Sequence, residues 1–291
     1  MYLLLKLLSQ LPLRSLYVLA RVIGLAMMLM PNATMRRVIR VNLNLAYPNL
    51  SNKQRENLEH ASVYSQFFTA VESIKSWGMP TSYSLKQIHH VYGADILTTA
   101  LQNPNGVIAV VPHFGTWEMM NAWLNQYASP VIMYKPSKDA GLDRFMLEAR
   151  QRLNATLVPT DESGVRAIFK ALKQGGFTAI LPDHVPDHSG GIYSDFMGQR
   201  VLTTTLVSKL AQKTQCSVVG LSCIRRNDGL GFDIVCDLLD SQILNKDLSV
   251  SVDSLNNEIK RIIARAPEQY MWGYKRFKQL ENQQQVYSKS I

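Results

Sequence analysis

The sequence predicts an α/β fold with a largely parallel central sheet, helices on both faces, antiparallel edge strands and a membrane-associated helix at the N-terminus. Its 291 residues suit one large domain with a substantial core. Between residues 107 and 181, short apolar runs alternate with helical stretches, as in a parallel sheet covered by helices. The chain begins with an apolar segment that carries basic residues. We therefore divide it into an N-terminal membrane-anchoring segment, residues 1–35, and a single α/β domain, residues 36–291.

The N-terminal segment is most apolar from Leu16 to Met30, where Arg21 interrupts it. This stretch is shorter than the roughly 20 apolar residues of a clean membrane span. An interfacial or marginally inserted helix fits better, and a buried helix of a soluble protein is the alternative. A cleaved signal peptide would need a small-x-small cleavage site, which is not convincing here. If the segment spans, Arg36, Arg37 and Arg40 favour a cytoplasmic position for everything after them.

The stretch from residue 36 to residue 103 is polar and predicts mainly helices. Ser51 is expected to cap a helix that runs to His60, and a second helix follows from about Ala61 to Trp77. His89 and His90 are adjacent and therefore point apart, which indicates surface or packing residues rather than ligands.

The alternating region begins with an apolar strand at Val107, and a polar, glycine-rich stretch from Asp183 to Val201 predicts a long loop. Further strands are expected at Pro130–Tyr134, Ala155–Val158 and Phe177–Leu181, with helices at Asp139–Arg152 and Ser163–Lys173 between them. After the loop we expect a helix from Thr203 to Lys213, an antiparallel edge pair of Ser217–Ile224 with Phe232–Cys236, and a helix from Ser251 to Ala266.

The chain is basic, with 31 lysine and arginine residues against 22 acidic ones and a net charge of +9. This charge suits anionic partners such as phospholipid head groups, phosphorylated glycans, acidic carrier proteins or nucleic acid. Nucleic acid is disfavoured because aromatic and basic residues do not alternate on any one predicted element. Cys216, Cys223 and Cys236 lack the spacing of a zinc site, which favours buried thiols in a reducing compartment.

A histidine and an acid follow the first strand of the alternating region. The strand ends at Pro112, so His113 lies in a turn at its carboxyl end, and Thr116 is expected to cap a helix that begins at Trp117. Glu118 would then fold back toward the imidazole. A histidine with a carboxylate partner can take a proton from an alcohol near neutral pH. The structural alternative is a turn histidine beside a surface glutamate.

Other polar residues follow later strands. Lys135, Thr160 and Asp183 should reach the same edge as His113, since the carboxyl ends of parallel strands meet there. We expect Lys135 and Asp183 to bind substrate. Asp183, His184, Asp187 and His188 could form a metal site, yet no regular element fixes their geometry. We expect neither a metal nor another cofactor.

Three separated stretches resemble the lipid A biosynthesis acyltransferases, within the wider lysophospholipid acyltransferase-like group. The stretch from His113 to Glu118 is similar to the family's His-x4-Asp/Glu motif. The stretch from Arg37 to Pro48 is similar to its N-terminal Asn-Leu-x-Leu-x-Phe-Pro segment. Pro267 to Trp272, followed by Lys275 to Lys278, is similar to its C-terminal signature. Because the three occur in order across the chain, they are more specific than the first motif alone.

The resemblance implies transfer of an acyl chain from acyl carrier protein to a hydroxyl of a phosphorylated glucosamine lipid, at the cytoplasmic face of the bacterial inner membrane. It implies that His113 is the general base and Glu118 its partner. Arg150 would contact phosphate or polarise the thioester carbonyl. The chemistry also requires donors for the oxyanion, and backbone N–H groups near Gly115 or the side chain of Arg150 could supply them. Basic residues suited to the acceptor phosphates and the acidic carrier are Lys135, Arg150, Arg152, Lys275, Arg276 and Lys278.

The chain departs from the family after the strand at Phe177–Leu181. Family members commonly have Asp-Gln there, whereas this chain has Asp183-His184, which leaves acceptor and acyl-chain specificity open. Three alternatives remain: an acyltransferase for another membrane glycolipid or lysophospholipid, a thioesterase that uses water as acceptor, and a non-catalytic protein that binds anionic lipid or RNA.

Overall fold

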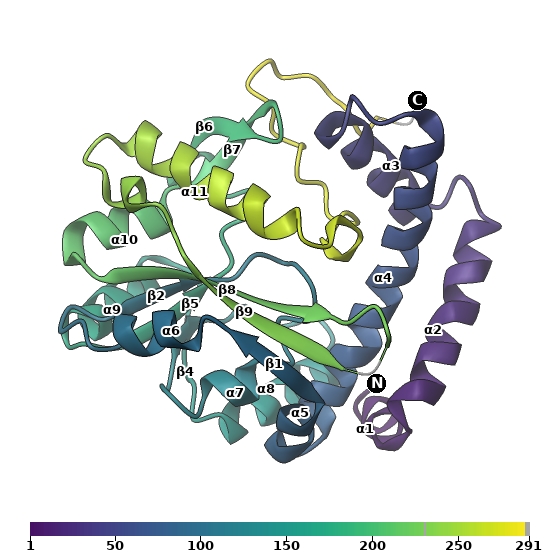
Figure 1. Ribbon diagram of the computed structural model, residues 1–291, viewed down its shortest axis with the longest axis horizontal. Coiled ribbons are helices and arrows are strands. Elements are labelled where there is room, and N and C mark those ends of the chain that lie inside the picture. The colour runs from purple at the N-terminus through teal and green to yellow at the C-terminus, as the bar shows by residue number, and fades with distance from the viewer. Residues whose placement is uncertain (230, 289–291) are drawn as a thin grey trace.

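The computed structural model describes residues 1–229 and 231–288. At its centre is a five-stranded sheet with the strand order β1-β9-β8-β2-β5 (Figure 1). Its neighbouring strands run parallel except for β8 and β9, which are antiparallel. The predicted largely parallel central sheet is therefore confirmed. The strands are β1 (Ile88–Tyr92), β9 (Phe232–Leu238), β8 (Ser217–Arg225), β2 (Val107–Val110) and β5 (Phe177–Ile180).

The antiparallel pair predicted at the edge of the sheet lies one strand further in. β1 pairs with the outer side of β9 and takes the edge position itself. The sequence did not indicate β1, because His89 and His90 are both exposed and break the alternation of apolar and polar residues. The two histidines are surface residues, as predicted.

Helices cover both faces of the sheet, as predicted. Along β2, Ile108 and Val110 point into one apolar core, whereas Val107 and Ala109 point into the other, which is the period of two expected of a strand. The first core is closed by α3 (Thr34–Ala46), α4 (Asn52–Gly78), α9 (Glu162–Lys173), α10 (Leu206–Thr214) and α11 (Leu248–Ile263). The second is closed by α5 (Thr81–Gln87), α6 (Ala94–Ala100) and α7 (Asn121–Leu124) (Figure 1).

Two small sheets flank the central one. β3 (Val131–Met133) and β4 (Thr156–Val158) pair in parallel, with α8 (Ala140–Arg152) between them in the chain. β6 (Gly191–Phe196) and β7 (Gln199–Thr204) form an antiparallel hairpin where the sequence predicted an irregular loop. That prediction was wrong because Met197 and Gly198, with φ of 56° and 79°, form a tight turn that the polar composition concealed. Short 3-10 turns lie at His188–Gly190, Ser241–Leu244 and Pro267–Gln269.

The predicted helices at residues 51–60 and 61–77 are one helix. Ser51 caps α4 as expected, and a capping box with Gln54 fixes its first turn. The helix then continues for 27 residues without a break. It brings several buried polar side chains, among them Glu72 and Lys75, beside the loop after β2 and the N-terminal helices.

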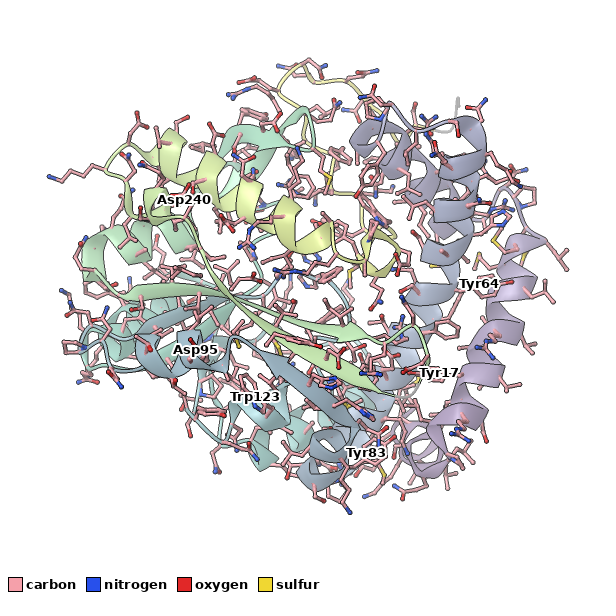
Figure 2. All side chains as sticks on the ribbon, viewed as in Figure 1. Tyr17, Tyr64, Tyr83, Asp95, Trp123 and Asp240 are labelled. Atoms are coloured by element: carbon pink, nitrogen blue, oxygen red, sulfur yellow. The ribbon has the colours of Figure 1, made fainter. Side chains whose placement is uncertain are left out.

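The N-terminal segment is a bent pair of helices, α1 (Tyr2–Gln10) and α2 (Leu13–Met28), which lie along one side of α4 (Figure 1). In the described part of the chain, no single helix has the length and apolar character of a membrane span. Among the described residues, only α1 and α2 taken together are long and apolar enough, and the pair is bent by 120°. Gly24 lets α2 approach α4, because a Cβ there would lie 2.5 Å from the ring of Tyr64. Figure 2 shows Tyr17 and Tyr64 between these two helices.

Candidate active site

His113 and Asp183 meet because their strands are neighbours in register. Val110 of β2 pairs with Ile180 of β5. His113 lies three positions after Val110, and Asp183 lies three positions after Ile180. Prolines at positions 112 and 182 stand directly before both side chains and end the strands. The carboxyl edge of the sheet thus delivers both groups to one place, as the sequence predicted for Asp183.

Asp183 holds the imidazole of His113 at two points. Nδ1 lies 2.8 Å from Asp183 Oδ1, and the backbone N–H of His113 donates to Oδ2 at 2.9 Å. Burial alone would raise the pKa of Asp183, but the charge and hydrogen bonds of His113 outweigh it and lower that pKa to about 2. The carboxylate can therefore only accept a hydrogen bond, which places the proton on Nδ1 and leaves Nε2 able to take another.

The expected partnership between His113 and Glu118 is wrong. Glu118 Oε1 accepts from Arg150 at 2.5 Å, and Oε2 accepts from Asn121 at 2.9 Å, so both oxygens bind elsewhere. The predicted helix start at Trp117 is also not formed, since residues 117–120 form turns and α7 begins only at Asn121. Glu118 cannot fold back toward the imidazole without that first helical turn. Asp183 holds the imidazole instead, and because it is buried with both oxygens bound to His113, it is not placed to bind substrate as expected.

His184 and Tyr274 form a stack on the ring of His113. The His113 and His184 ring centroids are 3.8 Å apart with an interplanar angle of 4°, and Tyr274 stacks on the far side of His184 at 4.0 Å. Desolvation of the ring and the nearby charge of His113 lower the pKa of His184 to about 4. His184 is therefore neutral at pH 7 and supports the imidazole without adding positive charge.

Gly115 has a structural role rather than the predicted role in stabilising an oxyanion. Its φ is 63°, and a Cβ there would lie 2.0 Å from the carbonyl oxygen of Cys223. Its N–H donates to Gln269 O at 3.0 Å, and the N–H of Thr116 donates to Cys223 O at 2.7 Å. These amides are engaged by the protein itself and are not free to bind a substrate oxygen.

The three sequence motifs converge on this loop. Met271 N–H in the C-terminal motif donates to His113 O at 2.9 Å. Asn42 in the N-terminal motif in turn donates from Nδ2 to the carbonyl oxygens of Trp272 and Tyr274, at 2.7 Å each. The two outer motifs therefore hold the backbone of the first.

A buried charge network that no sequence motif indicated lies behind the loop. The carboxylate of Glu72 accepts hydrogen bonds from Tyr17 at 2.7 Å, from Arg225 Nη2 at 2.7 Å and from Thr116. Thr116 is thus bound to α4 and does not cap a helix. The available signal was a glutamate within a largely apolar stretch of α4, which becomes informative only when its partners on α2 and β8 are known.

His113 faces a cavity of about 700 Å³. Glu118, Arg150, Lys135 and Thr160 also line it, so the polar residues predicted at this edge do gather around one space. Most of the remaining lining is apolar and includes Leu124, Ile132, Met133, Met146, Leu153, Ile180 and Leu206. The volume lies within the range of about 300–1,000 Å³ of small-molecule sites.

Other predicted ligands lie apart from this cavity. Arg276 is 1% exposed and donates to Leu202 O and Thr203 Oγ1, so its predicted contact with acceptor phosphate is wrong. Arg152 donates to the backbone of Trp77, and Lys275 and Lys278 are exposed. Within the described ranges, no group of three or more His, Cys, Asp or Glu side chains is arranged to hold a metal ion. All three cysteines are buried and free, as expected of structural thiols.

A histidine–carboxylate pair at the strand ends of an α/β sheet, beside an apolar cavity, has the parts of an enzyme site: a potential general base and a space for an apolar ligand. The chain belongs to the bacterial lipid A biosynthesis acyltransferase family, whose sequence profile matches residues 1–279. This confirms the family predicted from the three motifs.

Three related enzymes are similar to this chain over most of its length. The lipid A biosynthesis palmitoleoyltransferase of Escherichia coli K12 is 27% identical over 242 residues, which cover 83% of this chain and 78% of that protein. The lauroyltransferase of the same organism is 24% identical over 243 residues, with the same coverage. Its myristoyltransferase is 24% identical over 246 residues, covering 81% of this chain and 73% of that protein.

Proposed function

We propose that the protein transfers a fatty acyl chain from acyl carrier protein to a hydroxyl group of a lipid A precursor, a phosphorylated glucosamine lipid. The observation that carries this proposal is the imidazole of His113, which is oriented through Nδ1 by Asp183 and lines an apolar cavity of about 700 Å³. Family membership and the names of the related enzymes support the acceptor.

In the proposed reaction the acceptor hydroxyl attacks the thioester carbonyl carbon directly. Nε2 of His113 takes the hydroxyl proton as the new C–O bond forms, and the Asp183 carboxylate stabilises the resulting imidazolium. The tetrahedral intermediate collapses with cleavage of the C–S bond, and the imidazolium returns the proton to the leaving thiolate. No enzyme nucleophile is required, because the thioester is already activated.

Arg150 is the proposed electrophilic group. Glu118 fixes its guanidinium at 2.5 Å in the cavity wall, where it can polarise the thioester carbonyl and stabilise the oxyanion. Glu118 therefore remains part of the proposed machinery, but it acts through Arg150 rather than through His113. Lys135 is exposed at the same cavity and suits an acceptor phosphate.

We also propose that α1 and α2 hold the protein at the cytoplasmic face of the inner membrane. Their outer faces carry exposed apolar side chains, with Lys6, Arg14 and Arg21 exposed among them, an arrangement that suits the interface of an anionic bilayer. The exposed apolar residues of the pair include Leu3, Leu4, Leu7, Val18, Val22 and Leu25.

The test is to incubate the purified protein with acyl-loaded acyl carrier protein and the phosphorylated glucosamine lipid, and to weigh the lipid product by mass spectrometry. We expect His113→Ala to lower transfer at least about a hundredfold, the usual scale for loss of a general base. Near-normal turnover by this variant would contradict the assignment. Free fatty acid released at full rate without the lipid would indicate a thioesterase instead.

A further inference from the structure

A second apolar cavity lies beside the first, on the other side of Trp117. Its volume is about 340 Å³, and it is lined by α4, by Leu5 of α1 and by Leu142 of α8. Trp77, Trp117 and Met271 line both cavities and form the wall between them. Trp117 also packs edge-on against His113, with 5.2 Å between ring centroids. The ring of Trp117 therefore separates the second cavity from His113.

The lining of this cavity suits a hydrocarbon chain. Its polar residues direct their hydrogen-bonding groups toward the protein: Gln66 donates to Tyr270 O, Thr69 to Gly115 O and Ser73 to Thr69 O. In the described part of the chain, Trp77 Nε1 in the shared wall is buried without a hydrogen-bond partner. One free donor is fewer than the about two to four polar partners that an ordered water molecule needs, so the space favours apolar atoms.

We propose that this second cavity binds an acyl chain of the acceptor lipid, while the larger cavity takes the acyl chain of the donor. The inference rests on the proposed function, because transfer between two amphiphiles leaves two hydrocarbon chains to be accommodated on either side of one base. It goes beyond that function by assigning a separate site to the acceptor.

The position of α1 decides which chain occupies which cavity. Leu5 is 8% exposed and covers the second cavity, whereas Leu4 and Leu7 on the same helix are 56% and 70% exposed. A lipid already in the bilayer would meet this helix first. The donor chain arrives on a water-soluble carrier, and the larger cavity has the charged Lys135 and Arg150 in its lining, close to where the thioester would lie.

A matched pair of substitutions on α4 tests the assignment. Ala70 and Ala61 are both exposed, but Ala70 lines the second cavity, whereas Ala61 lines a different cavity between α2 and α4. With a phosphorylated glucosamine lipid that carries long acyl chains, Ala70→Phe should raise the acceptor KM at least about tenfold, because each excluded methylene weakens binding roughly fourfold. An acceptor with short chains, the KM for the acyl carrier protein and acceptor-independent thioester hydrolysis should change little. Ala61→Phe should resemble the wild type throughout.

An altered preference for donor chain length in Ala70→Phe, or equal effects of the two substitutions, would overturn the assignment. A second measurement needs no variant. A glucosamine lipid with a photoreactive diazirine at the end of its acyl chain should label peptides from α4 or around Leu142 of the wild-type protein. Labelling confined to the β3–β4 side of the larger cavity would refute the second site. Absence of any acyl transfer by the wild type, with labelling of α4, would instead refute the proposed reaction.

Discussion

At the scale of single residues, the site depends on which carboxylate binds His113 and which binds Arg150. The motif spacing places Glu118 five residues after His113, and this proximity in sequence suggested the pair. The structure instead joins His113 to Asp183, 70 residues away, and joins Glu118 to Arg150. The hydrogen-bonded His113 and the Glu118–Arg150 ion pair therefore line one cavity. In the proposed reaction they have different tasks, which are to move a proton and to stabilise negative charge.

The effect of Asp183→Asn should distinguish these tasks. An asparagine can donate to Nδ1, which favours the tautomer with its proton on Nε2 and blocks the base, so we expect kcat to fall by about a hundredfold to ten-thousandfold. Without the carboxylate the imidazolium is less stable, and the acid limb of the pH–rate profile should move to lower pH. Glu118→Gln should lower the rate without moving that limb, since Glu118 binds Arg150. If the acid limb moves only in Glu118→Gln, Glu118 rather than Asp183 is the partner of His113, as the motif suggested.

His184 provides a prediction about pH and stability. Its pKa is about 4 in the folded protein and about 6.5 in an unfolded chain. Between these values the unfolded state binds a proton that the folded state does not, so stability falls as the pH falls from about 6.5 to about 4. Water around the exposed part of His184 reduces the size of the effect.

Replacing His184 with glutamine, which keeps a polar side chain but cannot take up a proton, should remove that contribution. Thermal unfolding followed at several pH values should show a smaller decrease of Tm in His184→Gln than in the wild type over this range. A parallel decrease in both proteins would mean that the stacked ring binds its proton normally.

At the scale of elements, the sequence predicted the strands and helices that alternate along the chain between residues 107 and 181. The strands at Val107 and Phe177 and the helices between them were recognisable because long apolar runs and clear caps mark them. β1 and the β6–β7 hairpin were not, because their stability comes from pairing with β9 and from packing under α11 rather than from local pattern. Likewise, the register of β2 against β5, which selects Asp183, is a long-range property that no local motif contains.

The α1–α2 pair gives a prediction at this scale. Leu3 and Leu7 are 73% and 70% exposed, so replacing both with glutamine should leave the fold intact. Each leucine that enters a bilayer contributes about 1.5–3 kcal/mol, so the double substitution should weaken binding to anionic phospholipid vesicles by at least about tenfold. Cosedimentation measures this directly. Leu238→Gln is the control, because Leu238 is equally exposed, at 74%, but lies on β9. Equal loss in both variants would show that α1 has no special part in membrane binding.

At the scale of the whole molecule, one buried ion pair connects the parts that must act together. Glu72 belongs to α4 and Arg225 to β8, while Tyr17 comes from α2 and Thr116 from the loop that carries His113. Solvent reaches little of this ion pair, since the side chain of Glu72 is 0% exposed and that of Arg225 is 10% exposed. The N-terminal helices, the sheet and the catalytic loop therefore share one set of hydrogen bonds.

Removing one charge from this network should affect the whole fold rather than one element. Glu72→Gln leaves the Arg225 guanidinium buried without its counter-ion, and breaking a buried pair in this way lowers the free energy of unfolding by about 3–5 kcal/mol. Glu72→Leu combined with Arg225→Met removes both charges and should recover part of that loss, because neither partner is then left unpaired. Chemical denaturation of the three proteins measures the difference, and Glu281→Gln serves as control since its ion pair with Arg200 is half exposed. If Glu72→Gln unfolds like this control, the network does not hold the parts together. If the double variant is stable but its acyl transfer is impaired, the pair positions the catalytic loop as well as stabilising the fold.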